Sequence, residues 1–552
     1  MQKIRSITDR YIFNRLTFQI LMIVAVMITA VPYLHTIFGG YVKILLLYSL
    51  IIIAYEFFTG QLRETLKEKT SWLLIGFSFS YTITLFINRE SGLNEGIKSF
   101  VYVLVFFVLF YMTRKGQTKK SVIKELQIIS ATIIFCTFIL SLISLLTYAF
   151  SISGRYLNNN GVYVYYGLFE NRLWGLYNPN TGASLNCISL LLSIGFIATS
   201  RKKIITFFNL INVFLQFSCL LLTGSRAGYY TLLLLLVFLT SFWVFKKHTR
   251  LNLRVLSVMI ACSIMLSGLY IGTGLLLKEG YAYLPNLIQV NLSEDNSNSS
   301  SSDNDSTTQT EDDTNSSSPE NDNINQTEDN NNSSSSENDS TNQTEDNNNS
   351  SSSENDSTNQ TENNNTPSSS ENDNTSQNKK PGNSKPIPQK QDFTRLEELE
   401  NREGGFFNGR VVMWKACLEA FKESPLFGVG NENLITRSLA HLKDTDWAEH
   451  FRTGGSHNIY ICLLTSTGII GFLLIGVFAA LTFIKSIIVL LKNKKTSSFW
   501  LPISICICLL FYISEFVEAR ILFQVSTFSV IFWLFVGYMY RLAKLEEQDT
   551  KK

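Results

Sequence analysis

Long apolar segments recur along the chain and are separated by short polar connections. Each is roughly 17–25 residues long, enough for a helix to cross the ~30 Å hydrocarbon core of a bilayer. A helix in a soluble protein rarely stays apolar on every face over such a length. The pattern predicts an all-α, polytopic transmembrane helix bundle of about twelve spans, at residues 16–34, 37–58, 71–87, 97–112, 126–150, 181–199, 203–223, 226–245, 254–277, 458–484, 498–514 and 521–540.

Basic residues divide the connections into two classes. The N-terminus and every second connection are rich in Lys and Arg, as at Arg63, Lys67, Lys246 and Lys247, whereas the alternate connections hold few. Basic loops stay in the cytoplasm, so we expect a multi-pass plasma membrane protein with both termini cytoplasmic. The long connection 278–456 is then extracytoplasmic. We expect most other charges near the spans to be cytoplasmic anchors, and the first segment is too long to be a cleaved signal peptide.

The long connection is divided by composition. Residues 293–378 consist almost wholly of Ser, Asn, Asp, Glu, Thr and Gln, with 20 acidic and no basic residues and a repeat of 17 residues. So few apolar side chains cannot offset the entropy of ordering the tract. The sequence therefore predicts an N-terminal membrane bundle (1–277), a disordered acidic loop (278–392), an ordered extracytoplasmic loop (393–456) and C-terminal membrane spans (457–552).

The ordered loop contains one amphipathic segment. Residues 410–423 have apolar side chains at helical spacing, Asn408 can cap such a helix, and Pro425 ends it before a glycine turn at 427–430. The helix would lie on the membrane surface or cap the bundle. Its apolar face is expected to comprise Val411, Trp414, Leu418 and Phe421.

Cysteines and acidic residues do not suggest a disulfide or metal site. Seven of the eight cysteines lie in apolar segments, and Cys417 has no partner in its loop. Asp444 and Asp446 could hold a divalent metal against a sugar nucleotide, but the predicted topology places them outside the cell, where sugar nucleotides are absent. We therefore expect no metal or other cofactor, and no nucleic-acid partner.

Polar residues at the outer ends of spans are the candidates for chemistry, because ionisable groups in membranes are costly and usually functional. Arg226 lies in a small-residue turn, 223–228, where a guanidinium can bind phosphate oxygens. The alternative is an arginine that reaches lipid headgroups. Arg410 begins the amphipathic helix and by composition resembles a solvated arginine. His457 can act as a general base, although a lone histidine is more often structural.

Further candidates lie in the connection 151–180 and in the last outer turn. Tyr163, Tyr165 and Tyr166 could stack on sugar faces or belong to an interfacial aromatic belt, and the residues leave both interpretations open. Glutamates in the last outer turn are spaced to share a helical face. The candidate substrate-binding set is Arg172, Asn178, Asn180, Trp414, Asn458, Glu515 and Glu518.

Four segments, in this order, resemble the O-antigen ligase and O-antigen polymerase superfamily. They are GLYNPNTGA at 175–183, TGSRAG at 223–228, GRVVMW at 409–414 with PLFGVG at 425–430, and SHNIY at 456–460 with GIIG at 468–471. The resemblance covers roughly 165–490, and the repeat tract departs from it. The resemblance implies glycan transfer from undecaprenyl diphosphate at the outer membrane face, without a nucleotide sugar or an essential metal. By motif position, Arg226 and Arg410 would engage the donor diphosphate, and His457 would serve the acceptor hydroxyl or the diphosphate.

The resemblance favours a glycosyltransferase that polymerises undecaprenyl-diphosphate-linked oligosaccharide units into a capsular or O-antigen-type polysaccharide. A ligase that moves finished glycan to lipid or cell wall is the alternative. A polysaccharide flippase or other transporter is a second alternative, although no repeated half is visible. The expected partners are the lipid-linked oligosaccharide, membrane lipids, and a flippase and chain-length regulator of the same pathway.

Overall fold

The computed structural model describes residues 13–90, 92–114, 116–157, 163–169, 172–248, 252–299, 410–442, 447–493 and 497–551. Most of the predicted acidic loop lies outside these residues, as do Asn408, Asp444 and Asp446. Helix α10 (Leu253–Ser299) continues past residue 277, the end of the predicted ninth span, and includes the first residues of the acidic tract.

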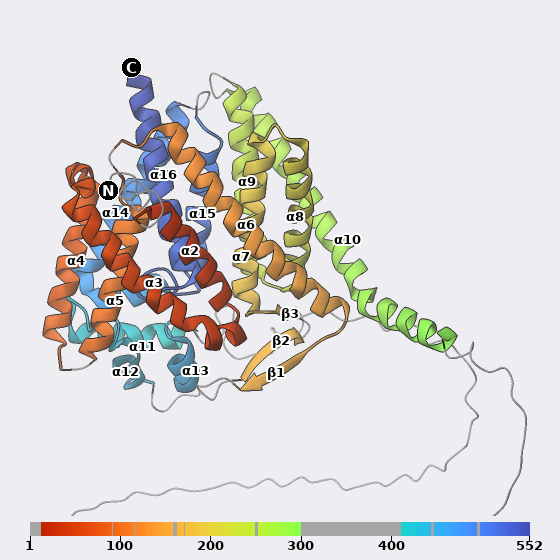
Figure 1. Ribbon diagram of the computed structural model, residues 1–552, viewed down its shortest axis with the longest axis horizontal. Helices are drawn as coiled ribbons and strands as arrows, with labels where there is room; N and C mark the ends of the chain where they lie inside the picture. The colour runs from red at the N-terminus through yellow and green to blue at the C-terminus, as the bar shows by residue number, and fades with distance from the viewer. Residues whose placement is uncertain are drawn as a thin grey trace, which may run out of the picture. The chain divides into compact units, whose positions relative to one another are not determined.

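Apolar helices form the bundle and correspond one to one with the predicted spans (Figure 1). Among the described residues, ten are long and apolar enough to cross a membrane, and α2 (Arg15–Thr29) and α15 (Trp500–Ser514) are shorter. The all-α bundle is therefore confirmed. The ten are α3 (Pro32–Phe58), α4 (Lys69–Ile87), α5 with the π-helix η3 (Leu93–Tyr111), α6 (Lys119–Ala149), α7 (Pro179–Thr199), α8 (Lys203–Leu222), α9 (Arg226–Lys247), α10, α14 (Ile459–Lys492) and α16 (Thr527–Lys551).

Helix α16 lies at the centre of the packing. Its side chains, such as Trp533, are almost wholly buried, and it packs against α2, α6, α14, α15 and η3. Helix α3 is the opposite case, because large apolar side chains such as Leu47 and Phe58 remain exposed. In a bilayer such a face contacts lipid, so the helices associate through close packing and polar contacts rather than through the exclusion of water.

Polar contacts of this kind join α6, α7 and α8. The Ser141 hydroxyl contacts the side-chain oxygens of Asn186 on α7, at 3.2 Å, and of Gln216 on α8, at 3.0 Å. The Asn212 amide on α8 donates to Ser189 on α7, at 3.0 Å. These groups are buried, and such interhelical bonds stabilise a membrane bundle modestly because the alternative is an unsatisfied polar group in hydrocarbon.

Three short helices cover the end of the bundle at which α14 begins: α11 (Arg410–Glu423), α12 (Leu434–Leu439) and α13 (Trp447–Gly454) (Figure 1). Helix α11 has the predicted bounds, but the predicted apolar face is not the buried one. Val411 and Leu418 are exposed, whereas the narrow face that packs against α14 comprises Met413, Ala416, Cys417 and Ala420. Small side chains are buried here in place of the larger apolar ones because they allow two helices to approach closely.

The glycine turn after α11 inserts into a break in α14. The amides of Val429 and Gly430 donate to the carbonyls of Thr465 and Ser466, both at 3.0 Å, and the Ile469 amide donates to the Pro425 carbonyl at 2.9 Å. At the break Gly468 has φ +64°, outside the helical range. The PLFGVG and GIIG segments thus satisfy one another's backbone groups.

A small antiparallel sheet that the sequence did not predict occupies the connection between α6 and α7. Its strands are β1 (Gly154–Leu157), β2 (Tyr163–Phe169) and β3 (Arg172–Gly175), in the order β1-β2-β3. Figure 1 shows the sheet at the same end of the bundle as α11–α13. Strand β3 runs directly into the turn before α7 and so fixes where Arg172 lies.

Candidate active site

Helix α7 begins with a capped turn that holds two of the candidate asparagines. The Asn178 side chain accepts a hydrogen bond from the Asn180 amide at 2.9 Å, and Pro179 occupies the first helical position, where its missing N–H is not needed. Asn178 is therefore an exposed cap residue, and the side chain of Asn180 is not used in the cap.

Arg172 joins this turn to the TGSRAG segment. Its Nε donates to the Thr223 carbonyl at 2.8 Å, and its Nη2 donates to Oδ1 of Asn180 at 3.3 Å. Gly224 has φ +60°, and a Cβ there would lie 3.6 Å from the Arg172 side chain. Two segments singled out in the sequence, 175–183 and 223–228, therefore meet through one guanidinium.

Glu518 connects the turn to His457. Its Oε1 accepts from Nδ2 of Asn180 at 3.5 Å, and its Oε2 lies 3.5 Å from Nδ1 of His457. The Glu518 side chain is 16% exposed and the His457 side chain 31% exposed, so the pair lies at a surface that a substrate can reach. Arg172, Asn180, Glu518 and His457 form one continuous polar cluster, which we call the His457 cluster.

Arg520 belongs to the same region, and the sequence analysis did not select it. Its backbone amide and Nε donate to the two carboxylate oxygens of Glu515, at 2.7 and 3.1 Å, and its guanidinium lies 3.9 Å from the centre of the Phe528 ring. The Glu515 carbonyl in turn accepts from the Ile459 amide at 3.0 Å. Glu515 is wholly buried and anchors the last outer turn. The prediction that Glu515 and Glu518 share a helical face is wrong, because α15 ends at Ser514 and the two glutamates lie in the turn that follows.

The two carboxylates have opposite electrostatic environments. Burial raises the pKa of Glu515 above its ordinary value, and Arg520 only partly opposes this. Burial alone would also raise the pKa of Glu518, but His457, Arg520 and Arg410 outweigh it, so the pKa of Glu518 lies below its ordinary value. Glu518 is thus held as a carboxylate at neutral pH.

His457 is fixed by its neighbours on both sides in the chain. Its backbone has φ +47°, a left-handed conformation that is uncommon for a residue other than glycine. The Ser456 carbonyl accepts from Nε1 of Trp414 at 2.9 Å, and the Asn458 side chain caps α14 by accepting from the amides of Tyr460 and Ile461, at 3.0 and 3.2 Å. Trp414 and Asn458 therefore position the histidine.

The two arginines expected to bind diphosphate have different surroundings. Arg410 begins α11, one helical turn before Trp414, whose side chain donates to the carbonyl of Ser456, and it therefore lies near the His457 cluster. Its side chain is partly exposed, and its charge contributes to the lowered pKa of Glu518. Arg226 begins α9, after the cap residue Ser225, and its side chain is exposed. Within the described part of the chain, Arg226 makes no hydrogen bond or ion pair, although its turn is held by Arg172.

The tyrosines of the sheet do not form one common face. Tyr165 stacks on Phe169, with ring centres 3.8 Å apart, and also packs near Trp174. Tyr163 lies under the guanidinium of Arg155 and remains largely exposed. Phe169, the strand partner of Arg172, is thus covered by Tyr165, and the arrangement leaves both the sugar platform and the interfacial belt open.

The comparisons with known proteins bear on part of this region. Residues 366–476 match the O-antigen ligase family model. This range contains Arg410, Trp414 and His457, together with the PLFGVG and GIIG segments. Arg172, Asn180 and Glu518 lie outside it. A comparison with curated proteins gave no match.

The helix bundle is that of a multi-pass membrane protein, and residues 366–476 of this protein are similar to the O-antigen ligase family. The resemblance to the O-antigen ligase and polymerase superfamily, which was inferred from four short segments, is confirmed by the match. The match supports a membrane function of the O-antigen ligase or polymerase type.

Proposed function

We propose that the protein polymerises oligosaccharide units carried on undecaprenyl diphosphate, by glycosyl transfer at the outer face of the membrane. The His457–Glu518 pair, at 3.5 Å and within reach of Arg410, is the observation that carries the proposal. An imidazole oriented by a carboxylate is a general base that recurs in unrelated enzymes. The O-antigen ligase domain supplies the reaction class.

In the proposed reaction His457 activates the acceptor hydroxyl. The Glu518 carboxylate favours the tautomer with the proton on Nδ1, which leaves Nε2 free to accept a proton. The acceptor oxygen forms a bond to the anomeric carbon of the donor sugar as its proton passes to His457. The bond between the anomeric carbon and the diphosphate oxygen breaks, and its electron pair leaves with undecaprenyl diphosphate. The proton then returns to solvent.

Arginines stabilise the leaving group in this scheme. A diphosphate develops negative charge as the sugar departs, and a planar guanidinium can bind two phosphate oxygens at once. Arg410 adjoins the His457 cluster, and Arg226 projects from a turn that Arg172 holds in place. Because Arg226 has no partner among the described residues, its guanidinium is available to a ligand.

A ligase is the second candidate, since the matched family model is described as O-antigen ligase. Both reactions use the same donor and differ in the acceptor, which is another lipid-linked unit for a polymerase and a different lipid or cell-wall group for a ligase. A flippase and a chain-length regulator are the proposed pathway partners in either case.

The deciding experiment compares lipid-linked glycan in cells with and without the gene. Loss of a polymerase leaves single units without a ladder, whereas loss of a ligase leaves a full ladder on the carrier. Purified protein with a synthetic lipid-linked unit as the only donor and acceptor should form dimers and longer products. A normal ladder and normal surface glycan after deletion would overturn both assignments.

A further inference from the structure

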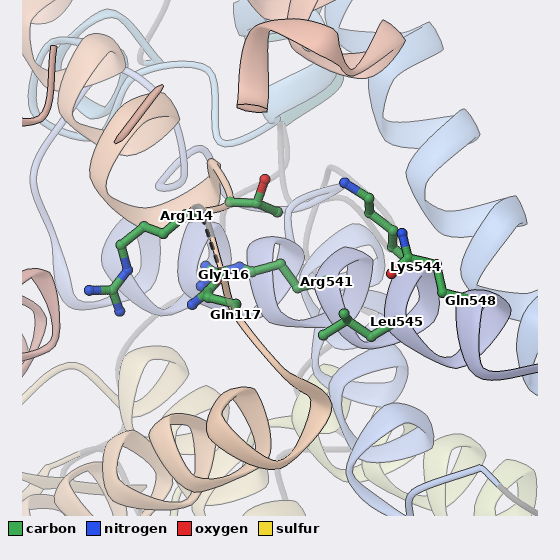
Figure 2. A pocket seen from close by; sticks show the side chains of 8 residues that line it. Arg114, Gly116, Gln117, Arg541, Lys544, Leu545 and Gln548 are labelled. Atoms are coloured by element: carbon green, nitrogen blue, oxygen red, sulfur yellow. Dashed lines mark hydrogen bonds between the residues drawn. The ribbon is translucent and has the colours of Figure 1, made fainter. Parts of the chain in front are cut away.

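A basic cavity lies at the other end of the bundle from the His457 cluster. Its volume is about 180 Å³, and Figure 2 shows the side chains around it. The segment between η3 and α6 and the C-terminal half of α16 both contribute. Arg541 follows the start of α16 by 14 residues, which at 1.5 Å per residue is about 21 Å along the helix. The lining residues are Thr113, Arg114, Gly116, Gln117, Arg541, Lys544, Leu545 and Gln548.

Three of the lining residues are cations, and two of them are neutralised from outside the cavity. Arg114 pairs with Glu125 at 3.1 Å, and Lys544 pairs with Glu68 at 2.6 Å. Neither glutamate lines the cavity. The third cation, Arg541, is in ion-pair contact with no carboxylate among the described residues.

Arg541 is also the most deeply buried of the three. The residue is only 2% exposed, although the sequence suggested a cytoplasmic anchor at this position. Its Nη2 donates to the Phe110 carbonyl at 2.7 Å, its Nε donates to the Gly537 carbonyl at 3.0 Å, and its guanidinium lies 4.3 Å from the Tyr538 ring centre. These neutral partners hold the group in place. The carboxylate of Glu125 acts on the charge of Arg541 without contacting it and is already paired with Arg114, so the three cations around the cavity outnumber the two carboxylates that neutralise them.

Two of the cations that line the cavity each carry a buried donor without an acceptor among the described residues. Within the described part of the chain, Nη1 of Arg541 and Nε of Arg114 have no hydrogen-bond partner. A buried donor left unpaired costs stability, and the penalty is greater for a charged group. An anion with several oxygens would satisfy both donors and supply the missing charge. Carboxylate and phosphate oxygens fit guanidinium groups best, and a tetrahedral phosphate can accept from groups on more than one side.

We propose that this cavity binds the phosphate group of an anionic lipid headgroup. The cavity lies between the ends of membrane helices, and by the charge rule this end faces the cytoplasm, where the leaflet surface is negative. Basic pockets between transmembrane helices commonly take such headgroups. Bound lipid would join Arg114 and Gln117 to α16, the helix that packs against α2, α6, α14, α15 and η3. The inference does not depend on the proposed glycosyl transfer.

The test is native mass spectrometry of the full chain with phosphatidylglycerol or phosphatidylcholine. We expect about 10-fold greater retention of phosphatidylglycerol, because one hydrogen bond to a charged group corresponds to at least that factor. Leu545→Glu, which places a carboxylate in the cavity wall without removing a polar contact, should abolish the preference. Leu545→Gln is the matched neutral control and should keep it. Lys485→Ala removes a paired lysine that does not line the cavity, and should also keep it.

A second measurement separates lipid from free phosphate. Inorganic phosphate at millimolar concentration should displace phosphatidylglycerol from the parent protein and should not bind Leu545→Glu. Binding of phosphate without any phosphatidylglycerol preference would assign the cavity to a soluble anion and overturn the lipid. Equal retention of both lipids together with no effect of phosphate, or a preference that survives Leu545→Glu, would overturn the site itself.

Discussion

Oε2 of Glu518 lies 3.5 Å from Nδ1 of His457, and a loop beyond α15 thus supplies the partner of a residue at the start of α14. Through Asn180 the same carboxylate reaches Arg172, so the residues of the His457 cluster come from three distant parts of the chain. Contacts of Ser456 and Asn458 fix the backbone at His457, and Glu518 is the group that faces Nδ1 of its imidazole ring.

Glu518→Gln should therefore lower the rate of glycosyl transfer by on the order of 10²–10⁴, since an amide can favour the wrong tautomer of the imidazole. Transfer from a lipid-linked donor by purified protein is the measurement. Glu419→Gln, which changes an exposed glutamate on α11, is the control and should retain full activity. An active Glu518→Gln variant would mean that His457 is not oriented by this contact.

The low pKa of Glu518 also makes a prediction about stability. A carboxylate whose pKa is lower in the folded protein than in the unfolded chain stabilises the folded protein at any pH above the unfolded-state pKa. This contribution is lost as the pH falls through the folded-state pKa. The difference in free energy of unfolding between the parent protein and Glu518→Gln should therefore shrink as the pH falls below the ordinary value of 4.5. Thermal unfolding in detergent above and below this pH measures it. A difference that grows on acidification would contradict the assignment.

Arg226→Lys and Arg410→Lys should each reduce transfer by about 10²–10³, because lysine keeps the charge but cannot hold two phosphate oxygens in one plane. Steady-state transfer rates, normalised to protein level in the membrane, test this. Arg437→Lys on α12 is the matched control, since this arginine is half exposed and pairs only loosely with Glu423. Rates equal to the parent protein in both lysine variants would mean that these arginines serve only to contact headgroups.

The contact between the glycine turn and α14 should tolerate no side chain. A Cβ on Gly468 would lie 2.3 Å from the backbone of Leu426, and one on Gly428 would lie 2.4 Å from that of Ser466. Both residues also have positive φ, so we expect Gly428→Ala and Gly468→Ala each to destabilise the fold by roughly 2 kcal/mol or more. Gly476→Ala, in open space on the same helix, should be neutral or slightly stabilising. Melting temperatures of the three purified variants measure these differences, and a melting temperature of Gly428→Ala and Gly468→Ala equal to that of Gly476→Ala would contradict the prediction.

The predicted orientation can be tested by labelling on intact cells. A cysteine introduced at Ser351 should react with an impermeant thiol reagent, whereas one at Lys247 should not, because basic connections remain cytoplasmic. Cys417 is buried and can be replaced to lower the background. Protection at Ser351 combined with labelling at Lys247 would invert the topology and place the His457 cluster on the cytoplasmic side.

Short-range features of the site could be predicted only in part. The bounds of α11 could be predicted from its apolar spacing and Pro425. Its buried face could not, because close packing against α14 favours small side chains over large ones. Arg520 was recognised in the last outer turn, but its contact with Glu515 could not be predicted, because the two groups meet only in the folded chain. The sheet was missed because its strands of four to seven residues leave no regular pattern beside the membrane segments.

The sequence by itself determined the membrane bundle, because a helix that must satisfy its backbone in hydrocarbon needs about twenty apolar residues and leaves a plain pattern. It also located Arg226, Arg410 and His457 in short segments. Only the tertiary structure decided that Glu518 and Asn180 join His457 and Arg172, while Arg226 stays unpaired among the described residues. The reason is that local packing and a few polar contacts determine which helices associate in lipid. These contacts depend on pairs of residues far apart in the sequence, and the hydrophobic periodicity of one segment does not reveal them.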